Sequence, residues 1–105
     1  MQIRIMQVLQ VIAKESCDNF VQLLKNKERS LRGTSTTFSV EKKNVWKHER
    51  YPGKIQINSL NKKIVSFEIK TRPEGKEWQI THAFVGYLNR HFSSEIAQIS
   101  IFFMS

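Results

Sequence analysis

The spacing of apolar residues changes near Gly33, and this change constrains the fold more than any other feature of the sequence. Before it, over residues 1–32, the chain has neither glycine nor proline, and apolar residues recur every three or four positions. After it, apolar and polar residues alternate. The first spacing is typical of an amphipathic helix and the second of strands with one buried face. The sequence therefore predicts a helix followed by a sheet.

The predicted N-terminal helix rests on a single apolar stripe. We place its end between Asn26 and Gly33, where basic residues crowd and the helix dipole favours cations. One alternative remains open at the start of the chain, because residues 1–5 alternate apolar and polar side chains and also suit a short strand. The residues of the stripe are Ile5, Leu9, Ile12, Ala13, Cys17, Phe20 and Leu24.

Four strands are predicted after this helix, over residues 36–40, 45–51, 55–60 and 64–70. Pro52-Gly53 supplies a turn in which the glycine takes a positive φ. A second helix is expected from Thr81, its N-cap, to His91.

A last strand is expected over residues 96–104, which carry apolar groups on both faces. Such a strand belongs in the interior of a sheet or under a partner. The predicted fold is then a two-layer α+β domain spanning residues 1–105. Its order is α-β-β-β-β-α-β, with a mainly antiparallel sheet of four to five strands.

The composition fits a small soluble protein. The chain has 105 residues, 40% of them hydrophobic, which suffices for one modest core. No stretch approaches the roughly 20 apolar residues of a membrane span, and we find no targeting segment, so no membrane partner is expected. Cys17 is the single cysteine, which excludes an internal disulfide and makes a reducing cytoplasm the simplest location.

Positive charge is concentrated in the middle of the chain. The net charge is +8, and residues 25–76 hold 14 basic side chains against five acidic ones, a net charge of +9. Such a surface attracts polyanions, and aromatic rings beside it can stack on bases. We therefore predict a non-enzymatic binding module for RNA or DNA. The expected contacts are Lys42, Lys43, Trp46 as the stacking ring, Lys47, Arg50, Lys54, Lys62 and Lys63.

Three alternatives remain open at this point. Trp46 can be a core residue, with the lysines merely facing solvent. A small metal-independent ribonuclease or toxin would use His48 with Arg50, and His82 as the second histidine of an acid and base pair. A protein-interaction or inhibitor module would present the same basic surface to an acidic partner.

Other chemistry has little support in the sequence. The cysteine and the three histidines show no close ligand pair, so no metal site is expected. The sequence contains no glycine-rich phosphate-binding motif, so no nucleotide cofactor is expected either. Cys17 is expected to be a buried small hydrophobe. His91 falls in the last turn of the second helix, where the dipole favours its protonated form.

The apolar surface also predicts self-association. The amphipathic helix and the C-terminal strand together have more apolar surface than one copy of the chain is expected to cover. A homodimer through the N-terminal helix or the C-terminal strand would cover the remainder.

Overall fold

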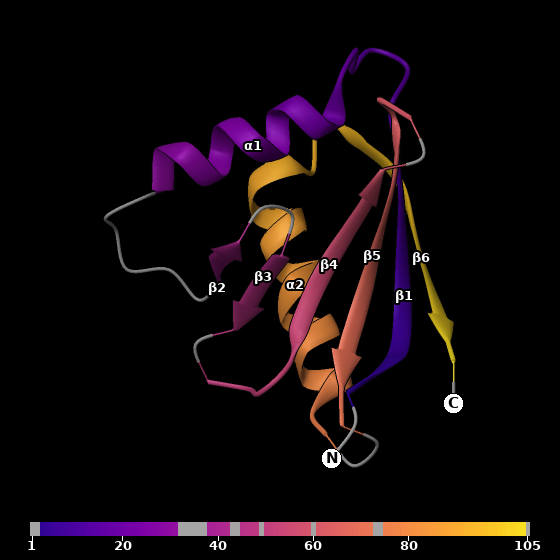
Figure 1. Ribbon diagram of the computed structural model, residues 1–105. Helices are drawn as coiled ribbons and strands as arrows, with labels where there is room; N and C mark the ends of the chain where they lie inside the picture. The colour runs from indigo at the N-terminus through magenta and orange to yellow at the C-terminus, as the bar shows by residue number, and fades with distance from the viewer. Residues whose placement is uncertain are drawn as a thin grey trace.

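The computed structural model describes residues 3–31, 38–42, 45–48, 50–59, 61–72 and 75–104. Six strands form one antiparallel sheet in the order β2-β3-β4-β5-β1-β6, with two helices on one side of it (Figure 1). The predicted α+β class is confirmed, although the sheet has six strands rather than four or five. The elements are β1 (Arg4–Ala13), α1 (Phe20–Leu31), β2 (Phe38–Lys42), β3 (Val45–His48), β4 (Lys54–Ser59), β5 (Ile64–Thr71), α2 (Glu77–Phe92) and β6 (Ile96–Phe103).

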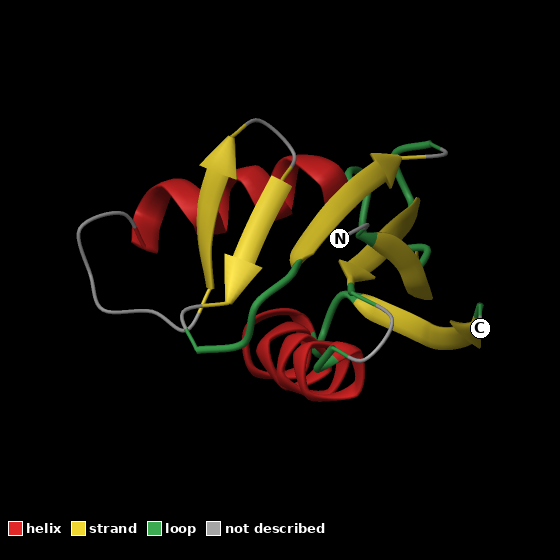
Figure 2. Cartoon of the chain, turned by 60° about the horizontal axis from the view of Figure 1, so that its bottom comes forward, coloured by secondary structure: helices red, strands yellow, loops and turns green. Residues whose placement is uncertain are grey.

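The core lies between the sheet and the two helices (Figure 2). Phe84 of α2 is fully buried, with its ring centroid 4.9 Å from that of Phe67 on β5 and 5.4 Å from that of Trp46 on β3. Phe20 of α1 meets Phe92 of α2 edge to face, with centroids 5.5 Å apart. Such aromatic pairs add to the stabilisation that area burial gives. They hold α2 against the sheet and α1 against α2.

Residues 4–13 form a strand, so the predicted N-terminal helix is wrong over this range. β1 lies between β5 and β6 and pairs with both. Leu9 and Ala13 face the helices, while Ile5 and Ile12 face the other side of the sheet. The stripe interpreted as helical thus combined residues from both faces of one strand. A strand with apolar groups on both faces gives no clean alternation, and helical spacing can appear by coincidence.

The first helix begins at Phe20, directly after its capping residue Asn19. Asn19 Oδ1 accepts a hydrogen bond from the backbone N–H of Gln22 at 3.1 Å, which satisfies one donor of the first turn. The helix ends at Leu31, inside the predicted interval. Cys17 precedes it and is buried at 6% exposure, as expected of a small hydrophobe.

The second helix begins earlier than predicted. It starts at Glu77, and its N-cap is Lys76, whose side chain makes no capping hydrogen bond. Thr81 is therefore not the cap. It lies inside the helix with no exposed surface, and its hydroxyl oxygen has no hydrogen-bond partner.

The strands after α1 lie close to the predicted ranges, although β2 extends to Lys42 and β3 ends at His48 rather than at residue 51. Residues 36, 37, 49 and 60 of those ranges lie outside the described residues. The last strand lies at an edge. β6 pairs with β1 on one side and with no described strand on the other, so the expectation of an interior position is wrong. The apolar groups on both faces of β6 remain to be explained. Neither helix within the described ranges is long and apolar enough to cross a membrane.

Substituting two glycines tests the packing at the end of the sheet. Gly53 has φ +146°, and a Cβ there would lie 2.7 Å from Ile80 Cδ1 and 2.9 Å from the carbonyl oxygen of Lys70. Gly53→Ala should destabilise the fold by about 2–4 kcal/mol, from backbone strain and overpacking. Urea unfolding measures this loss.

Gly86→Ala is the matched control, because a Cβ at this position of α2 has no neighbour within 4 Å. It should raise the free energy of unfolding by about 0.5–1 kcal/mol through helix propensity. Equal effects of the two substitutions would contradict the packing described for Gly53.

Candidate functional site

On the side of the sheet away from the helices, here called the open face, neither of the described helices lies over the strands (Figure 1). The residues that alternate with core positions point to this side. Glu68 of β5, for example, lies opposite Gln56 on β4 and opposite Val8 on β1. The open face is largely polar on β4 and β5 and more apolar toward β1 and β6. Its residues include Val8, Gln10, Ile12, Lys47, Lys54, Gln56, Asn58, Ser66, Glu68, Lys70, Ser100 and Phe102.

Three lysines, here called the lysine row, cross the open face on adjacent strands. Lys54 of β4 is the register partner of Lys70 of β5. Lys47 of β3 follows Val45 and Trp46, which pair with Gln56 and Ile55, so it lies on the same face as Lys54, and the same register carried one residue further would set the two lysines opposite each other. Glu68 Oε1 lies 3.8 Å from Lys70 Nζ and offsets part of the charge. The row thus concentrates positive charge where β3, β4 and β5 meet.

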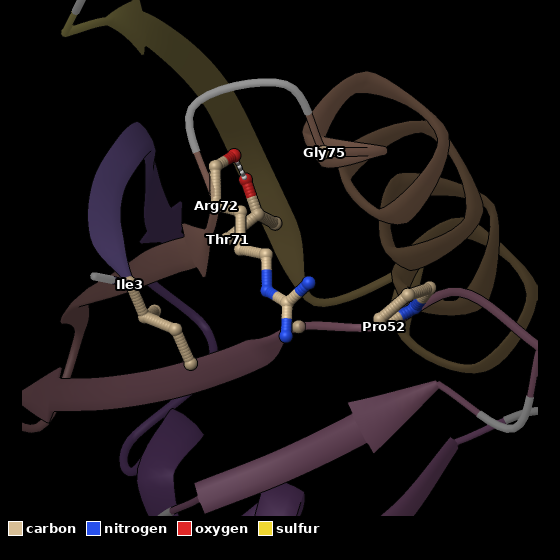
Figure 3. Close-up of a pocket in the computed structure, with 6 residues that line it drawn as sticks. Ile3, Pro52, Thr71, Arg72 and Gly75 are labelled. Carbon is tan, nitrogen blue, oxygen red and sulfur yellow. Dashed lines mark hydrogen bonds between the residues drawn. The ribbon is translucent and has the colours of Figure 1, made fainter. Parts of the chain in front are cut away.

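Arg72 extends this positive region beyond the end of β5. Its guanidinium lies over a pocket of about 320 Å³ and points toward Pro52 (Figure 3). The hydroxyl of Thr71, buried beneath, donates to the carbonyl oxygen of Arg72 at 2.9 Å. Arg50, exposed in the connection from β3 to β4, lies at the same end of the sheet. The pocket is lined by Ile3, Pro52, Gly53, Thr71, Arg72 and Gly75.

Lys62 and Lys63, also predicted contacts, lie at the opposite end of the sheet, in the turn from β4 to β5. At about 3.3 Å per residue, that turn is roughly 15–20 Å from the lysine row. Lys63 Nζ donates to the carbonyl oxygen of Glu15 at 3.0 Å. Both lysines line a hollow of about 550 Å³ together with Glu15 and Asp18. Acidic groups therefore reduce the positive potential at this end.

Trp46, the predicted stacking ring, is a core residue. It is 5% exposed, and its ring packs edge to face on Phe84 and on Tyr87, 6.0 Å away. The alternative that placed Trp46 in the core is thus confirmed, and no face of the ring is available to a base. Of the remaining predicted contacts, Lys42 ends β2, where it pairs with Val45, and Lys43 lies outside the described residues.

His48 organises the turn that follows β3. Its Nδ1 accepts hydrogen bonds from the backbone N–H groups of Arg50, at 2.9 Å, and Tyr51, at 3.2 Å. Its ring lies 4.6 Å from that of Tyr51. A nitrogen that accepts in this way carries no proton and is already occupied. The contacts of His48 therefore describe a structural residue.

The histidines of the proposed acid and base pair do not converge. His82 is exposed on α2 beside Trp78, at 6.1 Å between ring centroids, and Trp78 in turn contacts Phe103 of β6. The side of α2 that faces β3, and hence His48, carries Phe84. His48 and His82 thus lie on different sides of α2 and are not brought together as a pair. Within the described residues, no three His, Cys, Asp or Glu side chains gather to hold a metal ion.

His91 is half-buried at the end of α2, with its ring 4.8 Å from that of Tyr87. Burial lowers the pKa of this imidazole below its ordinary value of 6.5, and the positive charges of Lys27 and Arg90 lower the pKa further. The expectation that the helix dipole favours the protonated form is therefore wrong. Desolvation and two nearby cations outweigh the dipole.

Lys70 and Arg72 belong to the positive region but were absent from the predicted contacts. The alternation of Ser66, Glu68 and Lys70 placed Lys70 on an outward face, which was a usable signal. What the sequence lacked was the register that brings Lys54 opposite Lys70.

Comparisons with protein-family models, curated proteins and solved structures found no match to this chain.

Removing the imidazole of His48 tests its structural role. In His48→Ala, the N–H groups of Arg50 and Tyr51 lose their acceptor, and the free energy of unfolding should fall by about 1 kcal/mol. Arg50→Ala, which removes an exposed side chain from the same turn, should change it by less than about 0.5 kcal/mol. Equal losses in urea unfolding of the two variants would contradict this role.

The lowered pKa of His91 predicts a pH-dependent stability. Because the unfolded chain binds this proton at a higher pH than the folded one, stability should fall as the pH drops below about 6.5. Urea unfolding at about pH 7.5 and pH 5.5 measures the loss, which His91→Gln should reduce. His82→Gln, at an exposed position of the same helix, should retain the wild-type loss. Identical pH dependence in wild type and His91→Gln would refute the assignment.

Proposed function

We propose that this protein is a non-enzymatic binding module that holds nucleic acid against the open face through the lysine row. The observation that carries the proposal is the pairing of Lys54 with Lys70 directly across two strands, with Lys47 beside them. Arg50 and Arg72 lie at the same end of the sheet. A polyanion is the ligand class that such a group of cations attracts.

The pairing of Lys54 with Lys70 sets two cations opposite each other on adjacent strands, with Glu68 close to Lys70. Like charges directly opposite each other in an antiparallel pair destabilise the sheet. Departures of this kind from local rules are expected at functional sites, where a ligand compensates for them. A phosphate between the two ammonium groups would contact both of them.

The spacing of the row also suits a phosphate backbone. Adjacent strands lie about 4.8 Å apart, so the three lysines fall within roughly 10 Å, a span that several phosphates of one nucleic-acid strand occupy. Gln56, Asn58 and Ser66 on the same face can donate hydrogen bonds to phosphate or sugar oxygens. With Trp46 in the core, no described ring stacks on bases here. We infer binding through the backbone, with little sequence preference.

Replacing the row tests the proposal. Wild-type protein should bind labelled single-stranded RNA and DNA, and their duplexes, at low salt, and should release them between about 50 and 200 mM salt. The triple variant Lys47→Gln, Lys54→Gln, Lys70→Gln should bind at least about tenfold more weakly and reduce the salt slope by about 2–3. Fluorescence anisotropy gives both quantities, after urea unfolding has shown that the variant folds.

The matched control removes the same charge elsewhere. Lys14, Lys25 and Lys62 are exposed, and none of them lies at the end of the sheet that carries the row, so their triple glutamine variant should keep most of the affinity. Equal losses in both triple variants would mean that only net charge matters and would contradict a site. Absence of binding by wild type at low salt would end the proposal, and capture of an acidic protein instead would assign the row to that partner.

A further inference from the structure

The two edges of the sheet differ in how they are protected from pairing with another chain. The β2 edge is short and carries Glu41 and Lys42. Short edge strands and charged residues are the usual means of preventing strand pairing. The β6 edge runs over eight residues, Ile96–Phe103, and has no charged residue and no proline. It is the unprotected edge of this sheet.

β6 is also the one uncharged strand of the six. Every other strand carries at least one charged residue, in a chain whose net charge of +8 makes two copies repel. At its end lie four of the exposed large apolar side chains of the described residues, with Phe103 67% exposed. The uncharged strand, β6, therefore lies beside an exposed apolar surface. That surface consists of Trp78, whose ring centroid lies 6.4 Å from that of Phe103, and of Phe102, Phe103 and Met104.

The backbone of β6 is oriented for pairing on its free side. The N–H of Met104 donates to the carbonyl oxygen of Met6 at 3.0 Å, so Met104 directs its amide groups toward β1. In an antiparallel strand the direction alternates from residue to residue. Phe103, Ile101 and Ile99 therefore direct their N–H and C=O groups away from β1, toward the side where no described strand lies.

We propose that β6 pairs with β6 of a second copy of this chain, antiparallel about a two-fold axis through Ile101. This register sets Ile99 of each copy opposite Phe103 of the other, so all the outward amides find partners on the second copy. A self-complementary patch is what a two-fold interface requires. Neither copy brings a charged residue of β6 to the interface.

The pairing also explains the apolar groups on both faces of β6. Phe103 would cover Ile99 of the second copy on the helix side, and Phe102 would lie beside Ser100 of the second copy on the open face. Because the axis is perpendicular to the sheet, both open faces, each with its lysine row, come to the same side of one continuous sheet. The pairing itself is independent of nucleic-acid binding.

The oligomeric state of the full chain, freed of nucleic acid, tests the inference first. Sedimentation equilibrium should give about twice the chain mass of 12.4 kDa. Phe103→Lys would place a cation against Ile99 of the second copy and should weaken the dimer at least about 100-fold. Ile3→Lys, a similarly exposed position away from β6, should change its dissociation constant less than about threefold.

Cross-linking tests the register without a charged substitution. In a Cys17→Ala background, Ser100→Cys and Phe102→Cys variants should form a disulfide when mixed, because these positions lie opposite each other across the axis. Each variant alone should cross-link far less, since its own two copies are diagonal and farther apart. A wild-type monomer, or a dimer that survives Phe103→Lys and yields no mixed disulfide, would overturn the inference.

Discussion

The burial of Phe84 determines which side of the sheet remains open. Its ring contacts rings from β3 and β5 and thereby fixes α2 against one side of the sheet, while Phe92 of the same helix holds Phe20 of α1. Because both helices are attached to this cluster, neither covers the opposite side. The outward residues of β4 and β5 meet water, which explains why lysine, glutamine and serine are tolerated there. Any ligand of the sheet must approach from that side.

The sequence predicts the elements that bury only one of their faces, but it misleads about β1, which has apolar residues on both faces. β2 to β5 and the second helix follow from local spacing, since one side of each meets the core. β1 has apolar groups on both faces because β5 and β6 flank it, and its neighbours come from distant parts of the chain. No local pattern carries that information. The start of α2 was also hidden, because Lys76 offers no capping side chain to recognise.

For the candidate site, the sequence showed which segment carries the positive charge, but it did not show which basic residues lie side by side in the fold. Lys62 and Lys63 are neighbours in the chain, yet they lie beside acidic groups at the far end of the sheet. Lys54 and Lys70 meet only through the register of β4 and β5. Alternation placed Trp46 and His48 on one face of their strand correctly, but it could not show that this face is directed toward α2. Pairing and layer order are tertiary properties, so single-strand patterns leave them open.

The position of β1 between β5 and β6 has a consequence for how the protein folds as it is synthesised. β1 emerges first of the six strands, whereas β5 and β6, its two neighbours, emerge later than all the others. The meander from β2 to β5 can pair as it appears, because each strand follows its neighbour in the chain. β1 must wait with both apolar faces uncovered, and long-range pairing of this kind is slow and prone to aggregation. Until β5 and β6 have been made, β1 is therefore the strand most exposed to aggregation, although in the folded protein it is paired on both sides.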